Sequence, residues 1–116
     1  MRFAVSGIVL AAGLFGAAPA MAVEGNAQAG KQKDAMCQGC HGIPDYRTAF
    51  PAVYSVPKIG GQHAAYIVKA LQAYKSGERV HPTMKAIAAS LSDQDMADLA
   101  AFYSAPAGAP INASAK

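Results

Sequence analysis

The chain has 116 residues, of which 53% are hydrophobic and 15% are charged, with 10 lysines and arginines against 7 aspartates and glutamates. This length suits a single domain, and a net charge of +3 without a block of like charge excludes a dedicated nucleic-acid-binding surface. A domain this small buries only about two-thirds of its unfolded surface, so a crosslink or a cofactor would help it to fold.

The N-terminal segment 1–22 has the pattern of a secretory signal peptide. Met1 and Arg2 form a short positive start, the stretch 3–18 is apolar, and the Ala-Met-Ala sequence at 20–22 fits a signal-peptidase site. Because the apolar run is shorter than the ~20 residues needed to cross a bilayer, a cleaved leader is favoured over a membrane anchor. We therefore expect a mature chain without an integral membrane span, exported to the periplasm.

Four helices and no strands are predicted, which makes the fold class all-α. The first helix covers residues 26–38, which lack β-branched side chains, and Asn26 is well placed to be its N-cap. The following segment from Ile43 to Val56 contains or adjoins three prolines and has no helical period. We predict a loop there.

Apolar periodicity marks two later helices. The first has apolar residues at i, i+3, i+4 and i+7, namely Ile67, Ala70, Leu71 and Tyr74. It is expected to end at Ser76 and Gly77, because glycine is favoured just beyond a helix. A short helix is expected from Met84 to Ala89.

The last helix has the strongest start signal. Ser92 followed by Asp95 is typical of a capping box, and acidic side chains in a first turn suit the positive end of the helix dipole. Its apolar stripe consists of Met96, Leu99, Ala100 and Tyr103. Residues 105–116 are rich in Ala, Pro, Gly and Ser, so we predict a flexible C-terminal tail after a single domain spanning 23–104.

The segment 37–41 has the sequence Cys-Gln-Gly-Cys-His. Cysteines at i and i+3 of a helical turn face one side, so both sulfurs reach one edge of a flat ring, and the next imidazole projects toward its centre. C-x-x-C-H is the pattern of covalent haem attachment. We therefore expect thioether bonds from Cys37 and Cys40 to one haem c, with the neutral imidazole of His41 bound to the iron.

Three other interpretations of these cysteines are weaker. A dithiol redox motif is typical of a βαβ unit, and no strand is predicted. A zinc site needs four ligands, but His63 and His81 lack the usual spacing of paired zinc-binding histidines. A structural disulfide remains open in an oxidising compartment, although it leaves His41 without a role.

A six-coordinate iron needs a second axial ligand, and Met84 is the preferred candidate. Pro82 is expected to keep the segment 81–84 out of regular helix, so that the Met84 side chain folds over the far face of the ring. A thioether ligand raises the reduction potential. The alternative ligands are Met36, His63, His81 and Met96, of which His81 would give a lower-potential site and Met96 fits ordinary core packing.

Taken together, these residues resemble the bacterial class I c-type cytochromes over roughly residues 26–104. The likeness is greatest to one half of the dihaem proteins called cytochrome c-four, or to their single-haem relatives. The matching positions are Gly30, the C-x-x-C-H segment, 57–62, Tyr66, Leu71, Tyr74, Gly77, Arg79, Met84, 91–93 and 98–103. The resemblance implies a class I cytochrome c fold with about four short helices around one covalent haem.

The resemblance also implies contacts outside the motif. The carbonyl of Pro57 is expected to accept the other imidazole N–H of His41, which fixes the orientation of the ring. Arg79 is expected near a haem propionate, with a solvated surface charge as the alternative. Gly30 should cross the last helix at Leu99 and Phe102. Residues expected to wall the haem or form the protein core are Tyr66, Ile67, Leu71 and Tyr74. The stretch from His41 to Pro57 is longer than the family pattern.

These features predict a single-haem electron carrier and not an enzyme. With both axial positions filled, small ligands are kept off the iron, and the Fe(II)/Fe(III) couple transfers single electrons. The expected partners are redox proteins such as a terminal oxidase, a reductase or a dehydrogenase, contacted briefly by a monomer. The alternative is a haem enzyme or gas sensor in which Met84 leaves the sixth position open or labile.

Overall fold

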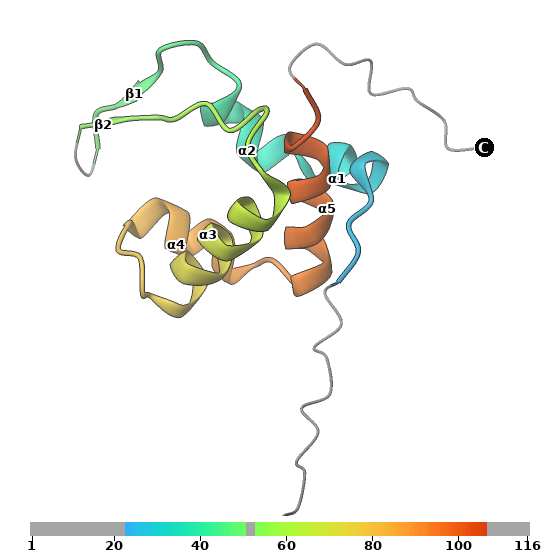
Figure 1. The fold of residues 1–116 in the computed structure, drawn as a ribbon. Helices are drawn as coiled ribbons and strands as arrows, with labels where there is room; N and C mark the ends of the chain where they lie inside the picture. Colours follow the sequence, from blue (N-terminus) through green and yellow to red (C-terminus); the bar gives the residue numbers. More distant parts are fainter. Residues whose placement is uncertain (1–22, 51–52, 107–116) are drawn as a thin grey trace, which may run out of the picture.

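The computed structural model describes residues 23–50 and 53–106. The helices are α1 (Ala27–Lys33), α2 (Ala35–His41), α3 (Ala64–Ser76), α4 (Pro82–Ala89) and α5 (Asp93–Tyr103), and a small antiparallel sheet of β1 (Arg47–Thr48) and β2 (Tyr54–Ser55) lies between α2 and α3 in the sequence (Figure 1). The predicted helical class is therefore confirmed. The predicted signal peptide lies outside the described residues, as does 107–116 of the predicted tail.

The first predicted helix is divided into two helices at Asp34. Asn26 caps α1 as predicted, since its side-chain oxygen accepts a hydrogen bond from the Ala29 N–H at 3.0 Å. The Asp34 carbonyl accepts from the N–H groups of Cys37 and Gln38, at 2.8 and 3.0 Å, and so begins α2. A single helix over 26–38 was therefore wrong, since Asp34 is both the C-cap of α1 and the N-cap of α2.

Helix α1 crosses α5 at Gly30, and the two helices lie side by side in Figure 1. A Cβ atom on Gly30 would lie 2.1 Å from the Asp98 carbonyl oxygen and 2.8 Å from the Cβ of Phe102. Only glycine permits so close an approach of the two backbones. The crossing at Phe102 is confirmed, and the other nearest atoms belong to the backbone of Asp98, the residue before Leu99.

The buried carboxylate of Asp98, only 3% exposed, ties the N-terminal segment to α5. It accepts hydrogen bonds from Lys33 Nζ at 2.6 Å, the Asn26 N–H at 2.8 Å and Gln94 Nε2 at 2.8 Å. Lys33 also pairs with Asp95 at 2.7 Å. The hydrogen bond from Lys33, followed by that from Asn26, lowers the pKa of Asp98 because both favour the charged form.

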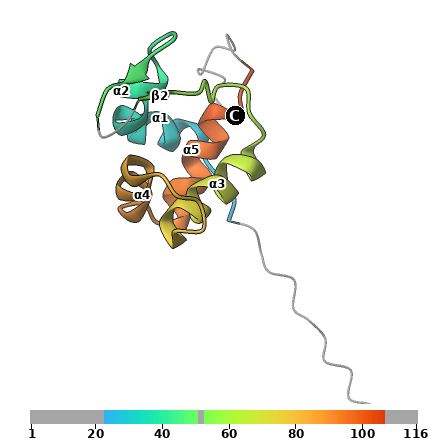
Figure 2. The ribbon, with the colours of Figure 1, turned by 90° about the vertical axis from the view of Figure 1, so that its left-hand side faces the viewer.

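The pair α1 and α2 lies on one side of α5, and the pair α3 and α4 lies on another (Figures 1 and 2). The buried core between them consists of Leu91, Met96 and Leu99, with Leu71 of α3 packed against it. Met96 is fully buried, so the explanation of this methionine by core packing is confirmed.

Local sequence signals correctly predicted the C-terminus of α3 and the N-terminus of α5. Gly77 has φ 86° and donates its N–H to the Ala73 carbonyl at 3.1 Å, which closes the C-terminus of α3. Ser92 and Asp95 form the predicted capping box at the start of α5.

Helix α4 begins at Pro82 and not at Met84 as predicted. Pro82 occupies the first turn, where its missing N–H costs nothing, and His81 is the N-cap. The Nδ1 atom of His81 accepts a hydrogen bond from the Met84 N–H at 3.3 Å. The expectation that Pro82 keeps 81–84 out of helix was therefore wrong, because proline terminates a helix only from its interior.

The predicted loop from Ile43 to Val56 contains the hairpin of β1 and β2. Arg47 pairs with Ser55 and Thr48 with Tyr54, and the Thr48 hydroxyl accepts from the Tyr54 N–H at 3.1 Å. The prediction of no strands was wrong because each strand has only 2 residues, too few to show an alternating pattern.

Candidate functional site

Helix α2 carries Cys37, Cys40 and His41 on its last turns. Both thiols are free, and all three side chains are half-buried. Cys37 packs against the core formed by Leu91, Met96 and Leu99. Its burial, together with the negative charge of Asp34, raises the pKa of the Cys37 thiol.

The His41 ring is oriented by a backbone carbonyl. Its Nδ1 atom lies 2.7 Å from the carbonyl oxygen of Pro57. Because a carbonyl only accepts hydrogen bonds, Nδ1 carries the proton and the lone pair of a neutral imidazole lies on Nε2. Nε2 is therefore the atom left to bind a metal. The contact with Pro57 is the one that the family resemblance implied.

The loop carrying Pro57 is attached to the end of α5. The Gly61 N–H donates to the Tyr103 carbonyl at 2.7 Å. Gly61 has φ 83°, a conformation that glycine adopts without strain. Ile59, between Pro57 and Gly61, lines the cavity described next.

An apolar cavity lies against His41. Its lining comes from α2, α3, α4, α5 and the neighbouring loops: Cys37, His41, Ile59, Ile67, Leu71, Met84, Ile87, Leu91, Leu99 and Tyr103. The structure thus brings together His41 and Met84, which come from different helices, beside the first cysteine of the motif. Cys40 is on the same helix but does not line the cavity.

The side chains around this cavity suit a c-type haem. Two thiols three residues apart match the two vinyl groups of the ring, and an imidazole with a free Nε2 and a methionine thioether are both haem-iron ligands. The aliphatic walls suit an apolar ring. No cluster of three or more His, Cys, Asp or Glu side chains able to hold a different metal occurs in 23–50 or 53–106.

The four alternative axial ligands do not line the cavity. Met96 is in the core, and Met36 is 47% exposed on α2. His63 is exposed at the start of α3, and His81 uses Nδ1 to cap α4. Met84 is therefore the methionine whose position fits iron binding best.

Arg79 contacts two tyrosines outside the cavity. Its Nη1 donates to the Tyr66 hydroxyl at 3.4 Å, and its guanidinium lies 4.8 Å from the centre of the Tyr74 ring. Of the four expected wall residues, Ile67 and Leu71 line the cavity, whereas Tyr66 and Tyr74 do not. The contact of Arg79 with a haem propionate stays a prediction.

A partly buried polar contact beside the motif was not predicted from the sequence. The Tyr103 hydroxyl donates a hydrogen bond to the carboxylate of Asp34, which is 8% exposed. Burial, followed by this hydrogen bond, raises the pKa of Tyr103. The sequence signal that could have predicted this contact is Tyr103 at the end of the apolar stripe of α5, since a buried hydroxyl needs a hydrogen-bond partner.

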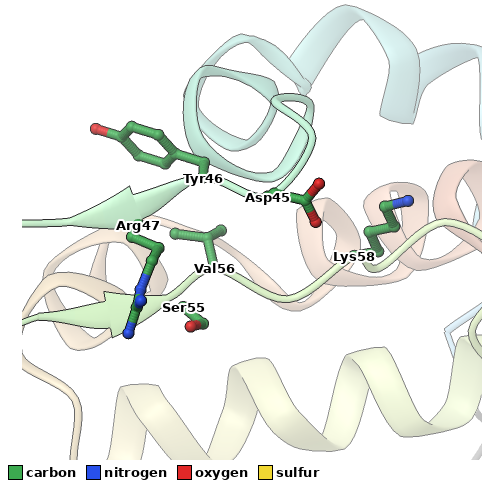
Figure 3. A pocket seen from close by; sticks show the side chains of 6 residues that line it. All are labelled: Asp45, Tyr46, Arg47, Ser55, Val56 and Lys58. Atoms are coloured by element: carbon green, nitrogen blue, oxygen red, sulfur yellow. The ribbon is translucent and has the colours of Figure 1, made fainter.

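A second cavity lies beside the hairpin and is lined by Asp45, Tyr46, Arg47, Ser55, Val56 and Lys58. Figure 3 shows Arg47 and Lys58 at opposite ends of it, with their charged groups pointing away from each other. These polar groups do not converge on one point. The cavity at His41 is therefore the better candidate for a functional site.

Residues 22–104 match the sequence model of the cytochrome c family. The chain is 38% identical over 96 residues to cytochrome c4 of Pseudomonas aeruginosa, covering 83% of this chain and 44% of that protein. It is 39% identical over 83 residues to cytochrome c-554(548) of Halomonas halodenitrificans, covering 69% of this chain and 95% of that protein.

The fold is also similar to a solved structure. Reduced recombinant cytochrome c4 from Pseudomonas stutzeri matches with a TM-score of 0.57 and 36% identity, over 71% of this chain and 46% of that chain. The chain thus spans about half the length of the cytochrome c4 relatives. Within the described ranges, no helix is long and apolar enough to cross a membrane. The chain belongs to the cytochrome c family, and its Cys-x-x-Cys-His segment implies one covalently attached haem c.

Proposed function

We propose that the protein is a periplasmic single-haem cytochrome that passes single electrons between redox proteins, with His41 and Met84 as the axial ligands. The observation that carries this proposal is the cavity that His41 and Met84 line together, beside Cys37. When bound, the haem supplies an Fe(II)/Fe(III) couple.

Each residue of the motif has a separate task in this proposal. The sulfurs of Cys37 and Cys40 hold the ring by thioether bonds, so that the cofactor is retained in both oxidation states. His41 offers Nε2 to the iron, and the Pro57 carbonyl, 2.7 Å from Nδ1, fixes the tautomer and the ring orientation. Met84 supplies a soft sulfur ligand from α4.

The aliphatic lining of the cavity supports a raised reduction potential. Ile59, Ile67, Leu71 and Ile87 lie around the positions of the two ligands and exclude water. A poorly solvated site disfavours the additional positive charge of ferric iron. This effect acts in the same direction as methionine ligation, so both favour the reduced state.

The lining argues against the alternative of a haem enzyme. Besides Cys37, His41 and Tyr103, the side chains around the cavity do not ionise. Peroxidase-like chemistry needs a positioned acid and base on the open side of the ring. The cavity provides no such pair in addition to the proposed ligand and attachment residues.

Periplasmic location and partner choice rest on different observations. The signal-peptide pattern of residues 1–22, outside the described part, supports export. A carrier that must release each partner quickly needs a small, short-lived contact. We therefore propose a monomer that exchanges electrons with proteins such as a terminal oxidase, a reductase or a dehydrogenase.

The test is Met84→Ala in protein made by a host that attaches haem c. We expect loss of the sulfur-to-iron charge-transfer band of the ferric protein and a fall in the reduction potential, because the thioether is removed. Met36→Ala is the matched control, since Met36 is 47% exposed and does not line the cavity. An unchanged band and potential in Met84→Ala would exclude Met84 as a ligand.

A further inference from the structure

Tyr103, the last residue of α5, contacts both segments that hold His41. Its hydroxyl donates to Asp34, at the start of the helix that ends in His41. Its main-chain carbonyl accepts from the Gly61 N–H at 2.7 Å, in the loop whose Pro57 carbonyl binds His41 Nδ1. One residue therefore connects the helix that carries the imidazole to the loop that orients it.

The contact between Tyr103 and Asp34 is partly shielded from water. Asp34 is 8% exposed, and the Tyr103 ring lines the cavity and packs with Cys37 against the core. A buried carboxylate without a donor is costly, because it loses its hydration without compensation. The Tyr103 hydroxyl provides such a donor. The same aspartate accepts the N–H groups of Cys37 and Gln38 through its carbonyl, so its position also sets the start of α2.

The pair also places a negative charge beside the haem attachment site. Asp34 is the N-cap of α2, and its main-chain carbonyl accepts a hydrogen bond from the N–H of the attachment residue Cys37 at 2.8 Å. A nearby negative charge stabilises ferric iron more than ferrous iron, because the ferric state carries one more positive charge. A hydroxyl that donates to the carboxylate reduces this effect.

We propose that Tyr103 is a positioning residue for His41, and that its hydroxyl, by its hydrogen bond to Asp34, raises the reduction potential of the haem. The inference rests on the proposed role of His41 as an iron ligand. It concerns a hydroxyl that neither binds the haem iron nor forms the thioether bonds.

The experiment is a double-mutant cycle on the intact haem protein. Tyr103→Phe keeps the ring and removes the hydroxyl, and Asp34→Asn keeps the shape and removes the charge. At neutral pH, Tyr103→Phe should lower the potential and Asp34→Asn should raise it. In the Asp34→Asn background, Tyr103→Phe should have little further effect, because the charge through which the hydroxyl acts is gone.

Two results would overturn the proposal. One is an unchanged potential in Tyr103→Phe, and the other is an equal shift with and without Asp34→Asn, which would indicate that the hydroxyl acts by a route other than the charge of Asp34. Tyr46→Phe removes a hydroxyl from the hairpin, away from the His41 cavity, and should leave the potential unchanged.

Haem content and the ferric charge-transfer band keep this test separate from the proposed function. Haem content, measured by the pyridine haemochrome assay, shows that each variant has folded and acquired its cofactor. If the unmutated protein lacks the sulfur-to-iron band, the ligand assignment of Met84 fails. The potentials of the cycle still decide the role of Tyr103, because they do not depend on that band.

Discussion

The two proposed ligands are held in very different ways. His41 is the last residue of α2, whose N-cap Asp34 is bonded to Tyr103, and its ring is hydrogen-bonded to the Pro57 carbonyl at 2.7 Å. Met84 lies in the first turn of an 8-residue helix that is capped by the His81 side chain at 3.3 Å. The cysteine and histidine side is therefore connected to α5 by polar contacts, whereas the methionine side depends on a short helix and apolar packing.

This difference indicates which of the two proposed ligands should detach first when the protein is destabilised. Local stability is lowest where few buried contacts hold a segment. Under mild denaturation we expect the methionine ligand to detach while the histidine stays bound. The following substitutions test each side, beginning with the largest expected effect.

The first prediction concerns the crossing of α1 and α5. Gly30→Ala would place a Cβ atom 2.1 Å from the Asp98 carbonyl oxygen, so the two helices must separate. We expect a loss of about 3 kcal/mol in the free energy of unfolding, as for overpacked cores. Chemical denaturation of the haem protein measures it. Gly60→Ala is the control, because a Cβ there would meet no atom within 4 Å. Equal stability of the two variants would contradict the account.

The second prediction concerns Asp98, whose carboxylate joins Lys33, Asn26 and Gln94. Asp98→Ala removes the acceptor that all three share and leaves the Asn26 N–H without its partner. We expect a loss of about 2 kcal/mol in the free energy of unfolding, measured at neutral pH by denaturant titration. A change below about 0.5 kcal/mol, typical of surface substitutions, would show that this cluster contributes nothing.

The same carboxylate makes stability depend on pH. Since the folded pKa of Asp98 is lowered, its stabilising contribution is present above the unfolded pKa of about 3.9 and is lost as pH falls toward the folded pKa. Acid unfolding should therefore be less steep in Asp98→Asn than in the unmutated protein below about pH 4. Parallel acid-unfolding curves would contradict the lowered pKa.

The third prediction concerns the methionine side and has the smallest expected effect. His81→Ala removes the side-chain cap of α4 and should cost about 1 kcal/mol. The ferric sulfur-to-iron band should then disappear at a lower denaturant concentration than in the unmutated protein. His63→Ala is the matched control, because His63 is also an N-cap but makes no side-chain capping bond. Identical behaviour of the two variants would show that the cap does not support Met84.

Signals local in the sequence predicted most of the helices and the centre of the site. The Asn26 cap, the capping box of Ser92 and Asp95, and the glycine after α3 each depend on residues within one turn. The C-x-x-C-H segment is equally local, and the comparison with the cytochrome c family bears out the covalent haem.

The features that were not predicted from the sequence depend either on contacts between distant residues or on a local signal that was misinterpreted. Asp34, at the break between α1 and α2, has its carboxylate bonded to Tyr103, 69 positions later. The hairpin strands are too short to show an alternating pattern. Pro82 was misinterpreted because proline is favoured in the first turn of a helix but disrupts its interior. The Asp34–Tyr103 contact and the pairing of the hairpin strands are decided by packing between segments, which a short window of sequence does not contain.

The most direct test of the central claim is the absorption spectrum of the ferrous protein under carbon monoxide. An electron carrier with His41 and Met84 both on the iron should keep its spectrum unchanged at neutral pH, because no coordination position is open. Rapid and stoichiometric formation of a carbon monoxide complex by the unmutated protein would contradict the account and favour a haem enzyme or gas sensor.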